Sequence, residues 1–348
     1  MKFKAIGVAL LLLAIFVVAQ QPSQGQGGGQ AGGQKPPTPT VAVDIPGVIK
    51  GGTTIEPFVR DRSQSTEGPN RLPDGNVIFS ERPLNRVTKV DLKDNSFSVW
   101  LDDSLGAQGM SFDPQGNLVA TQVLPEDTAM TVGIIYPKDK IGVIADVFDG
   151  VHLTRPNDLT IMPNGGVYFT DPGREKLPAH KFGPTPPLPK AIYYIPPGTD
   201  AAARRRGLKK VFTGDAEWPK ANLNGLILGA DSKVLFAHDM GGEYLSAWDI
   251  NPDGTLKARR NFAKYEPING KAPGGDGMGI DAAGNIYACT TPGLQVYGPD
   301  GQYKGQIPMF NNCQNIAFVG ADRSTLFATA QGILYKIPMV AKGLPRGR

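Results

Sequence analysis

Short apolar runs separated by turn residues make up most of the chain. Runs of this kind, bounded by Gly, Pro, Asn and Asp, predict β-strands joined by tight turns. The 348 residues include 44 Gly and 31 Pro, and because both residue types interrupt helices, the composition also argues against long helices. Hydrophobic residues make up 40% of the sequence, which is enough for a large core. The pattern therefore predicts an all-β protein.

The strands recur in an internal repeat. Each copy has a polar residue, a short apolar run, a turn and a second apolar run, and the copies begin at Glu67, Gln108, Asn157, Asn224, Asp276 and Gln314. Eight residues after each leading residue comes the turn position, which holds Gly75, Gly116, Gly165, Ser232, Gly284 and Asp322. The sixth copy has one extra turn residue. This register predicts six equivalent strand pairs.

Further strands follow each pair and complete a unit of four. After the sixth copy only GILYKIP follows, while TTIEPFVR (residues 53–60) stands alone near the start of the folded part. Joining the two ends supplies the missing strand. The sequence thus predicts a six-bladed β-propeller of four-stranded blades over residues 46–345, closed by an N-terminal strand that completes the last blade. A sandwich or an open solenoid would not explain why one strand is missing at the C-terminal end and one extra strand is present at the N-terminal end.

The first 45 residues have a different composition. Residues 1–19 have two lysines, an apolar run and small residues before Gln20, which predicts a secretory signal peptide, with an uncleaved anchor as the alternative. Residues 20–45 are rich in Gln, Gly and Pro and predict a disordered linker. We therefore expect a secreted or periplasmic protein with no membrane segment after signal cleavage.

The charge of the chain bears on its expected binding partners, and its cysteines bear on disulfide formation. Removing Lys2 and Lys4 with the signal lowers the formal charge from +4 to +2, and no basic face is interleaved with aromatics, so we expect no nucleic-acid partner. No oligomerisation signal stands out. Cys289 and Cys313 are the only cysteines. We expect two unpaired buried thiols, with one disulfide in an oxidising compartment as the alternative.

The leading residues of the repeats suggest a metal site. In a propeller the innermost strand of each blade begins at one mouth of the central channel, so all six polar residues should form a ring there. The ring offers two carboxylates, Glu67 and Asp276, and several amides, but no His or Cys. Oxygen ligands with this charge suit one divalent metal ion, Ca²⁺ before Zn²⁺.

Four segments of the chain resemble motifs of a known family. The segment RPNDLTIMPNGGVYFTDPG (155–173) resembles the gluconolactonase signature, and three other segments resemble further motifs of the SMP-30/gluconolactonase/LRE-like family: TEGPNRLPDGNVIFSE, LNGLIL and GGDGMGID. The resemblance covers roughly residues 50–340. It implies a catalytic divalent metal surrounded by Glu67, Asn157, Asn224 and Asp276, with Asn157 binding the metal or the substrate and Arg155 facing the substrate. It implies no role for Gln108 or Gln314.

Lactone hydrolysis also needs a base that takes a proton from water. Asp276 is one candidate, if one of its oxygens stays free of the metal, and a histidine is the other. Among His152, His180 and His238, topology favours His238. The proline-rich segment after Asp171 is expected either to cover the channel mouth or to pack on a neighbouring blade.

The resemblance implies a gluconolactonase-like enzyme, a lactonase-type carboxylic ester hydrolase that acts on a sugar lactone or similar small lactone. Two alternatives remain at the level of sequence. One is a phosphotriesterase-like hydrolase on the same metal ring, because pocket walls and not ligand types separate the two reactions. The other is a non-enzymatic secreted propeller that binds a glycan or protein, with Ca²⁺ only bracing the channel.

Overall fold

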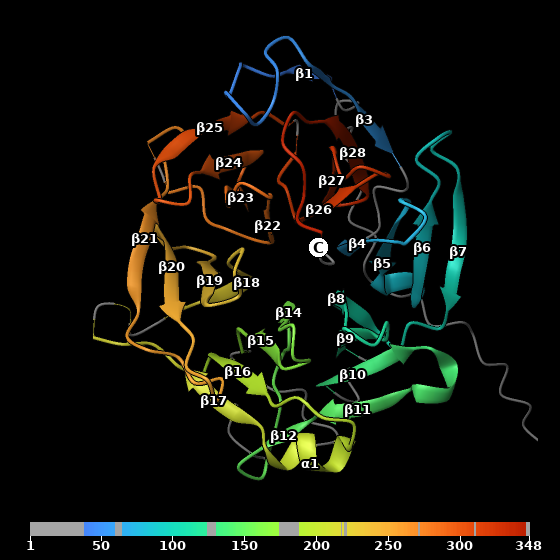
Figure 1. Cartoon of the computed structure of the whole chain (residues 1–348), viewed down its shortest axis with the longest axis vertical. Coiled ribbons are helices and arrows are strands. Elements are labelled where there is room, and N and C mark those ends of the chain that lie inside the picture. Colours follow the sequence, from blue (N-terminus) through green and yellow to red (C-terminus); the bar gives the residue numbers. More distant parts are fainter. Residues whose placement is uncertain are drawn as a thin grey trace, which may run out of the picture. The chain divides into compact units, whose positions relative to one another are not determined.

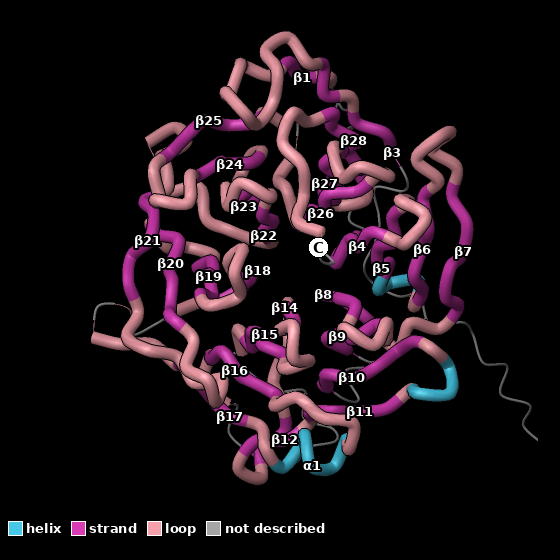
Figure 2. Tube along the Cα trace, in the orientation of Figure 1, coloured by secondary structure: helices cyan, strands magenta, loops and turns pink. Residues whose placement is uncertain are grey.

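The computed structural model describes residues 38–59, 65–123, 130–173, 188–216, 218, 221–270, 272–309 and 311–345. The predicted signal peptide, most of the predicted linker, His180 and most of the proline-rich segment after Asp171 lie outside these residues. Within the described part, no helix has the length and apolar character needed to cross a bilayer. The described chain consists almost entirely of strands and loops (Figure 2).

Six four-stranded antiparallel sheets surround a common centre (Figure 1). Blade 1 holds β4 (Thr66–Arg71), β5 (Val77–Glu81), β6 (Arg86–Val90) and β7 (Phe97–Asp102). Blade 2 holds β8 (Ala107–Phe112), β9 (Leu118–Val123), β10 (Met130–Tyr136) and β11 (Gly142–Ala145). Blade 3 holds β14 (Leu159–Ile161), β15 (Val167–Asp171), β16 (Ala191–Ile195) and β17 (Lys209–Phe212).

The other three blades repeat this order. Blade 4 holds β18 (Leu223–Leu228), β19 (Val234–Asp239), β20 (Tyr244–Asp249) and β21 (Arg260–Lys264). Blade 5 holds β22 (Met278–Ile280), β23 (Ile286–Cys289), β24 (Leu294–Tyr297) and β25 (Tyr303–Ile307). Blade 6 holds β26 (Asn315–Val319), β27 (Thr325–Ala330), β28 (Ile333–Pro338) and β3 (Pro57–Val59). The prediction of an all-β, six-bladed propeller is confirmed.

The last blade is closed by the N-terminal part of the chain. Strand β3 pairs antiparallel with β28, with Val59 opposite Ile333 and Phe58 opposite Leu334. Strand β3 lies within the TTIEPFVR segment that stood alone in the sequence. The closing strand is therefore the one predicted.

The turns inside the strand pairs keep the predicted register. The backbone φ is positive at Gly75 (88°), Gly116 (80°), Gly165 (89°), Ser232 (59°) and Gly284 (83°). In the sixth blade the corresponding residue with positive φ is Arg323 (57°), one position beyond Asp322, because this copy has one extra turn residue; Gly320 (86°) in the same turn also has positive φ. Glycine dominates this position because it adopts positive φ without steric cost.

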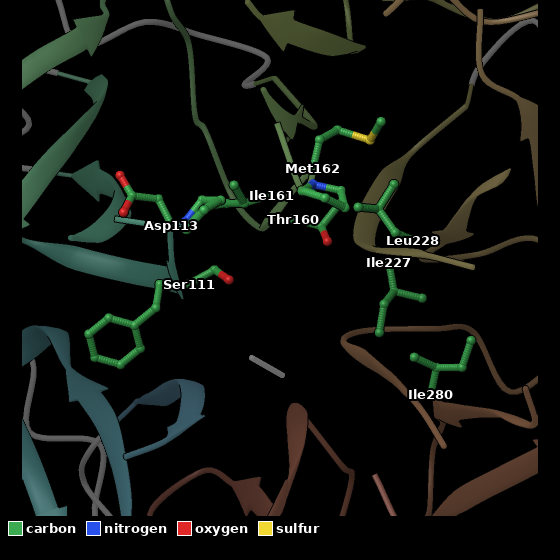
Figure 3. Close-up of a pocket in the computed structure, with 11 residues that line it drawn as sticks. Ser111, Asp113, Thr160, Ile161, Met162, Ile227, Leu228 and Ile280 are labelled. Atoms are coloured by element: carbon green, nitrogen blue, oxygen red, sulfur yellow. The ribbon is translucent and has the colours of Figure 1, made fainter. Parts of the chain in front are cut away.

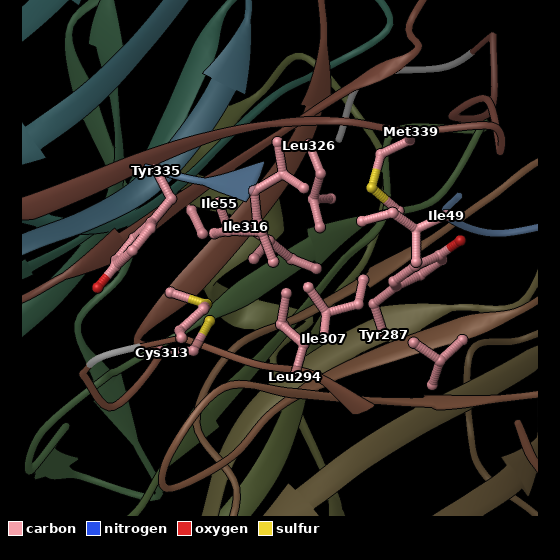
Figure 4. Packing of buried hydrophobic residues seen from close by; sticks show 14 of the residues in the cluster. Ile49, Ile55, Tyr287, Leu294, Ile307, Cys313, Ile316, Leu326, Tyr335 and Met339 are labelled. Atoms are coloured by element: carbon pink, nitrogen blue, oxygen red, sulfur yellow. The ribbon is translucent and has the colours of Figure 1, made fainter. Parts of the chain in front are cut away.

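The core is divided among the six interfaces between neighbouring blades. Six clusters of buried apolar side chains each join two blades. Alternate residues of one strand face opposite neighbours: in β15, Phe169 belongs to the cluster shared with blade 2 and Tyr168 to that shared with blade 4. Figure 4 shows the cluster between blades 5 and 6, which also receives Ile49 and Ile55. The apolar runs are continuous because both faces of each blade are buried.

Small elements lie outside the blades. Strand β1 (Thr40–Val41) pairs with β2 (Thr54–Ile55), and β12 (Val147–Phe148) pairs with β13 (Val151–His152). Among the described residues, the helical segments are α1 (Ala201–Arg206) and the 3₁₀ turns η1 (Arg82–Leu84) and η3 (Lys138–Lys140). Ala42 and Ile45, which lie before the predicted boundary at residue 46, are buried in the interface between blades 5 and 6.

The two cysteines are joined to each other. Cys289 ends β23 and Cys313 precedes β26, and their Cα atoms lie 4.9 Å apart in a disulfide. The expectation of two unpaired thiols is therefore wrong. Their separation of 24 residues in the sequence hid the pairing, since only the packing of blade 5 on blade 6 brings them together.

Removing this disulfide should destabilise the propeller. A bond that closes a loop of this length stabilises a protein by about 3 kcal/mol, mainly by restricting the unfolded chain. We expect the Cys289→Ala/Cys313→Ala variant to lose about that much free energy of unfolding in urea titrations. Reductant should lower the stability of the parent protein and leave the variant unchanged. Equal stability of parent and variant under oxidising conditions would contradict the prediction.

Candidate active site

The six leading residues of the repeats meet at one end of the central channel. Glu67, Gln108 and Asn224 lie in the innermost strands β4, β8 and β18. Asn157 and Asp276 lie two residues before β14 and β22, and Gln314 directly precedes β26. The first strands of all blades lie around the centre of the ring in Figure 1. Glu67, Asn157 and Asn224 are 8%, 7% and 4% exposed, so their polar groups are directed inward and not toward bulk water.

Direct bonds connect neighbouring blades at this ring. The backbone N–H groups of Gly109, Gly225 and Gly277 donate to the carbonyl oxygens of Asn157 (3.2 Å), Asp276 (3.0 Å) and Gln314 (2.6 Å) of the next blade. Each donor immediately follows a leading residue. The ring positions are therefore fixed relative to each other by the backbone.

Glycine is required where these backbones approach. A Cβ on Gly225 would lie 2.0 Å from the carbonyl oxygen of Asp276, and one on Gly277 would lie 2.4 Å from Cγ of Asn315. Real Cβ contacts are never this short. The glycine after a leading residue therefore lets adjacent blades come close enough to share one site.

A second set of links lies directly behind the ring. The hydroxyls of Ser80, Thr121 and Thr170 donate to carbonyl oxygens of the next blade, those of Gln108 (2.8 Å), Asn157 (2.6 Å) and Asn224 (2.7 Å). In blade 5 the corresponding position is Cys289, whose carbonyl oxygen accepts a hydrogen bond from the backbone N–H of Asp276. The carbonyl oxygen of Thr170 accepts the equivalent bond from the N–H of Asn157 in blade 3. There the link to the next blade is the disulfide to Cys313, the neighbour of Gln314.

His238 occupies the same position in blade 4. Its imidazole is fully buried, Nδ1 is hydrogen-bonded to the hydroxyl of Tyr265, and the two rings stack. A Cβ on Gly275 would touch Nδ1 at 2.0 Å, so the imidazole packs against the residue that precedes Asp276. Burial lowers the pKa of His238 to about 3, which keeps the side chain neutral. The structure thus places His238 behind Asp276 and not on an exposed channel wall. His152 lies in β13, outside the blades.

Asp276 has a strongly perturbed carboxyl group. Burial raises its pKa to about 7, and the negative charge of Asp158 adds to this rise. A hydrogen bond from Asn224 and the positive charge of Arg155 oppose it. Asp158 of blade 3, Asn224 of blade 4 and Asp276 of blade 5 therefore interact with one another.

Asp158 is a site residue that the sequence analysis missed. It is 3% exposed, its Oδ1 accepts from the N–H of Leu159 (2.9 Å), and its charge reaches Asp276. A Cβ on Gly109 would lie 2.8 Å from Asp158 Oδ1, so the neighbouring glycine makes room for the carboxylate. The sequence does contain a signal: at the position after the leading residue, four of six copies have glycine and the third has aspartate.

Gln314 also gains a structural role. Its amide nitrogen donates to Oε1 of Glu67 (3.2 Å), and its amide oxygen accepts from the backbone N–H of Gln331. Gln314 therefore orients the Glu67 carboxylate across the seam between blades 6 and 1. Among the described residues, no such side-chain contact defines a role for Gln108.

The residues of the ring fit a hard cation. The Oδ1 atom of Asn224 is buried and has no hydrogen-bond donor, which is costly unless a ligand of opposite polarity approaches it. The carboxylates of Glu67 and Asp276 and the amide of Asn157 supply further oxygens. Within the described residues there is no cluster of three or more His, Cys, Asp or Glu side chains, so a site here depends on the amide oxygens. Such an oxygen-only set is typical of Ca²⁺.

A pocket of about 510 Å³ opens next to the ring. Its described lining consists of Arg82, Arg155, Pro172, Gly173, Lys190, Asn222 and Met240. The buried carboxylate of Asp171 fixes part of this wall: it accepts from the backbone N–H groups of Thr154 (2.8 Å), Arg155 (2.9 Å) and Gly173 (2.9 Å). Arg155 is exposed, and its charge also acts on Asp276, so one residue of the pocket wall interacts with the ring.

The other ends of the inner strands offer different chemistry. A cavity of about 350 Å³ there is lined by Ser111, Thr160, Ile227, Leu228, Ile280 and neighbouring residues. Figure 3 shows these side chains around the opening. Among its described lining residues only Asp113 is charged. The reactive groups are therefore concentrated at the mouth that carries Glu67 and Asp276.

Comparison with known proteins agrees with this geometry. Residues 65–332 match the family described as SMP-30/Gluconolactonase/LRE-like region. The chain belongs to this family. A curated gluconolactonase of Zymomonas mobilis subsp. mobilis is 26% identical over 308 residues, which cover 81% of this chain and 80% of the relative. The predicted family and the prediction of a lactonase-type hydrolase are both confirmed.

Solved structures of the family share the fold. A gluconolactonase of Xanthomonas campestris superposes with a TM-score of 0.69 at 23% identity, covering 88% of this chain and 98% of that one. Regucalcin of Agrobacterium tumefaciens, a calcium-binding protein, superposes with a TM-score of 0.63 at 16% identity, covering 83% and 95%. At these identities the likeness supports the propeller itself. The roles of individual site residues stay predictions.

Proposed function

We propose that this protein is a secreted, metal-dependent hydrolase that opens a sugar lactone or similar small lactone. The observation that carries the proposal is the buried, donor-free Oδ1 of Asn224 beside the Asp276 carboxyl group, under a pocket that contains Arg155. Glu67, Asn157, Asn224 and Asp276 would hold one divalent cation, for which Ca²⁺ is the best match to an oxygen-only ligand set. The family's gluconolactonases and its calcium-binding regucalcin support this proposal.

Each residue of the ring has its own role in the proposed reaction. A divalent cation bound there would polarise the lactone carbonyl and favour ionisation of water. Asp276 would take the proton from the attacking water and return it to the ring oxygen as the ester C–O bond breaks. The product is the open hydroxy acid, so one water is consumed and no other reactant is needed. Asp158 keeps the proton affinity of Asp276 high, and Arg155 orients the substrate.

The position of His238 suggests that it acts through Asp276. It is neutral, fully buried and packed against Gly275, so it can fix the Asp276 segment without exchanging protons with the channel. We therefore propose Asp276 as the base and His238 as a positioning residue. A His238→Gln variant should lower kcat without shifting the pH profile, whereas loss of a base would shift or flatten the profile.

A substrate panel tests the activity. Purified mature protein should hydrolyse gluconolactone, EDTA should abolish turnover, and added Ca²⁺ should restore it. Preferential turnover of an organophosphate triester would favour the phosphotriesterase-like alternative. Thermal stabilisation by Ca²⁺ without turnover of any lactone would favour a binding propeller. Replacing Ca²⁺ by Mg²⁺, Mn²⁺ or Zn²⁺ in the same assay identifies the preferred ion.

Export is part of the proposal. It rests on the charged and apolar pattern of residues 1–19 and is supported by the disulfide between Cys289 and Cys313, since disulfides persist mainly in oxidising compartments. The mature N-terminus is expected at Gln20 and can be determined by mass spectrometry of protein expressed with its leader. An intact Met1 on the exported protein would argue for an uncleaved anchor.

Stabilisation by metal should depend on pH. The pKa of Asp276 is raised to about 7 in the native protein, whereas an aspartate in the unfolded chain has a pKa of about 4. Between these two pH values the native protein therefore binds more protons than the unfolded chain. The free energy of unfolding of metal-free protein should therefore fall as pH rises through this range. Ca²⁺ compensates the ionised carboxylate, so it should raise Tm more at about pH 8 than at about pH 5. The Asp276→Asn variant should show little of either effect, and a pH-independent Tm in metal-free parent protein would contradict the assignment.

A further inference from the structure

A further pocket, which we call the α1 pocket, lies between blades 2 and 3 on the face away from the ring. Its volume is about 570 Å³, and its described lining comes from residues 113–117, 134–144, 164–165 and 198–204. Each of these four segments is described without a gap. Strand β8 runs from the ring to Phe112, so the turn that follows it lies at the opposite end of the blade. Helix α1 packs beside β11 and closes one side (Figure 1).

Two buried polar side chains of blade 2 form one wall of the α1 pocket. The Asp113 carboxylate accepts from the backbone N–H groups of Gln115 (2.9 Å) and Asn117 (2.8 Å) and from the Asn117 amide nitrogen (2.7 Å). Oδ1 of Asn117 is also buried, but it accepts no hydrogen bond from the described part of the protein. A buried acceptor without a donor is costly, so a donor group on a ligand would stabilise this wall.

Blade 5 contains the same arrangement with its acceptor satisfied. Both turns have the sequence Asp-x-x-Gly-Asn, at residues 113–117 and 281–285. Asp281 accepts from the backbone N–H (2.8 Å) and the amide nitrogen (2.7 Å) of Asn285, as Asp113 does from Asn117. There Oδ1 of the asparagine accepts from Nζ of Lys304 (3.3 Å). The protein thus supplies a donor for this atom in blade 5 and none from the described residues in blade 2.

The α1 pocket also contains a buried guanidinium group. Arg204 is 6% exposed, and its Nε and Nη2 donate to the carbonyl oxygens of Pro196 (3.1 Å) and Gly165 (3.1 Å). Among the described residues, Nη1 has no acceptor and no carboxylate forms an ion pair with Arg204. Burial lowers the pKa of Arg204, and the negative charge of Asp113 opposes this shift. The buried charge therefore lacks a direct anionic partner, which makes it costly.

We propose that the α1 pocket binds a small carboxylic acid that has a hydrogen-bond donor on the adjacent carbon and an apolar remainder, that is, an α-hydroxy or α-amino acid. Its carboxylate accepts from Nη1 of Arg204, and its hydroxyl or ammonium group donates to Oδ1 of Asn117. Ile134, Ile141 and Ile144 line the same pocket and offer apolar contacts for the remainder. This site is separate from the ring, so the proposal stands without the proposed lactonase function.

A matched ligand series tests the two polar contacts by calorimetry on the purified mature protein. Leucine or its α-hydroxy analogue, 2-hydroxy-4-methylpentanoate, should bind at least about tenfold more tightly than 4-methylpentanoate, which lacks the donor. Leucinamide, which lacks the carboxylate, should bind more weakly by a similar factor. The amino and hydroxy compounds together show which donor the site prefers. Equal affinity for either truncated compound, or no binding of both complete ones at about 10 mM, would overturn the proposal.

Substitutions locate the site. Arg204→Gln should weaken binding of the preferred acid at least about tenfold. Arg206→Gln, which changes an exposed arginine of the same helix outside the pocket, is the matched control and should leave binding unchanged.

A pocket-filling variant keeps the test valid if Arg204→Gln fails to fold, since Arg204 also bonds two backbone carbonyls. A Cβ on Gly142 would meet only the carbonyl oxygen of Lys140, at 3.9 Å, which is an ordinary contact. Gly142→Leu therefore adds bulk to the pocket lining with little effect on the strand, and it should abolish binding. Unchanged affinity in Gly142→Leu would show that the acid binds elsewhere and would overturn the proposal.

Discussion

Asp276→Asn is expected to reduce lactone turnover about a thousandfold, because the same carboxylate is proposed as metal ligand and as base. The variant should also lose metal-induced stabilisation. It should still fold, because asparagine keeps the size of the side chain and removes a buried charge that is destabilising in metal-free protein. Steady-state kinetics with gluconolactone and calorimetric titration with Ca²⁺ measure the two losses.

Stability provides the control for this variant. Since the pKa of Asp276 is raised in the native protein, metal-free Asp276→Asn should be at least as stable at neutral pH as metal-free parent protein. Asp231→Asn changes an exposed turn carboxylate that accepts from the N–H of Lys233 (2.9 Å), and it should leave turnover unchanged. Full activity in the Asp276 variant would show that the metal mechanism is wrong.

Gly225→Ala is expected to destabilise the propeller by about 3 kcal/mol, the upper end of the usual cost of overpacking. The added Cβ would lie 2.0 Å from the carbonyl oxygen of Asp276, so the two blades must separate. Separation breaks the hydrogen bond from the Gly225 N–H to that oxygen (3.0 Å). Because Asn224 and Asp276 flank this contact, turnover should fall together with stability. Urea denaturation and kinetics on the same preparation measure both.

A nearby glycine supplies the matched control. A Cβ on Gly241 would have no heavy atom within 4 Å, and Gly241 is not among the residues with positive φ. Gly241→Ala should therefore leave the free energy of unfolding and the turnover close to those of the parent. If both variants behaved alike, close approach of the backbones at Gly225 would not be what holds the ring together.

The repeat in the sequence was sufficient to predict the architecture. Its turn position requires positive φ, and glycine at this position in most copies predicted the strand pairs and hence the number of blades. The missing strand of blade 6 and the unpaired segment before residue 60 predicted how the ring closes. The position of the leading residues then predicted which side chains share the channel mouth. These properties follow from local backbone chemistry repeated along the chain.

Other features depend on contacts between blades and could not be predicted from local pattern. The pairing of Cys289 with Cys313 requires the packing of blade 5 on blade 6. The role of Gln314 requires a partner, Glu67, that is 247 residues away in the sequence. The burial of His238 depends on Tyr265 and Gly275. Asp158 is the exception, because comparison of the six copies at that position would have identified it.

The pairing of β3 with β28 has a consequence for the order of events during synthesis. Residues Pro57–Val59 leave the ribosome early, yet their partners Ile333–Tyr335 are among the last to be made. Blade 6 therefore cannot be completed while the chain is still growing, and the ring stays open until synthesis is nearly finished. Contacts this distant in sequence also form slowly. The final closure of the ring therefore takes place only after nearly the whole chain has been made.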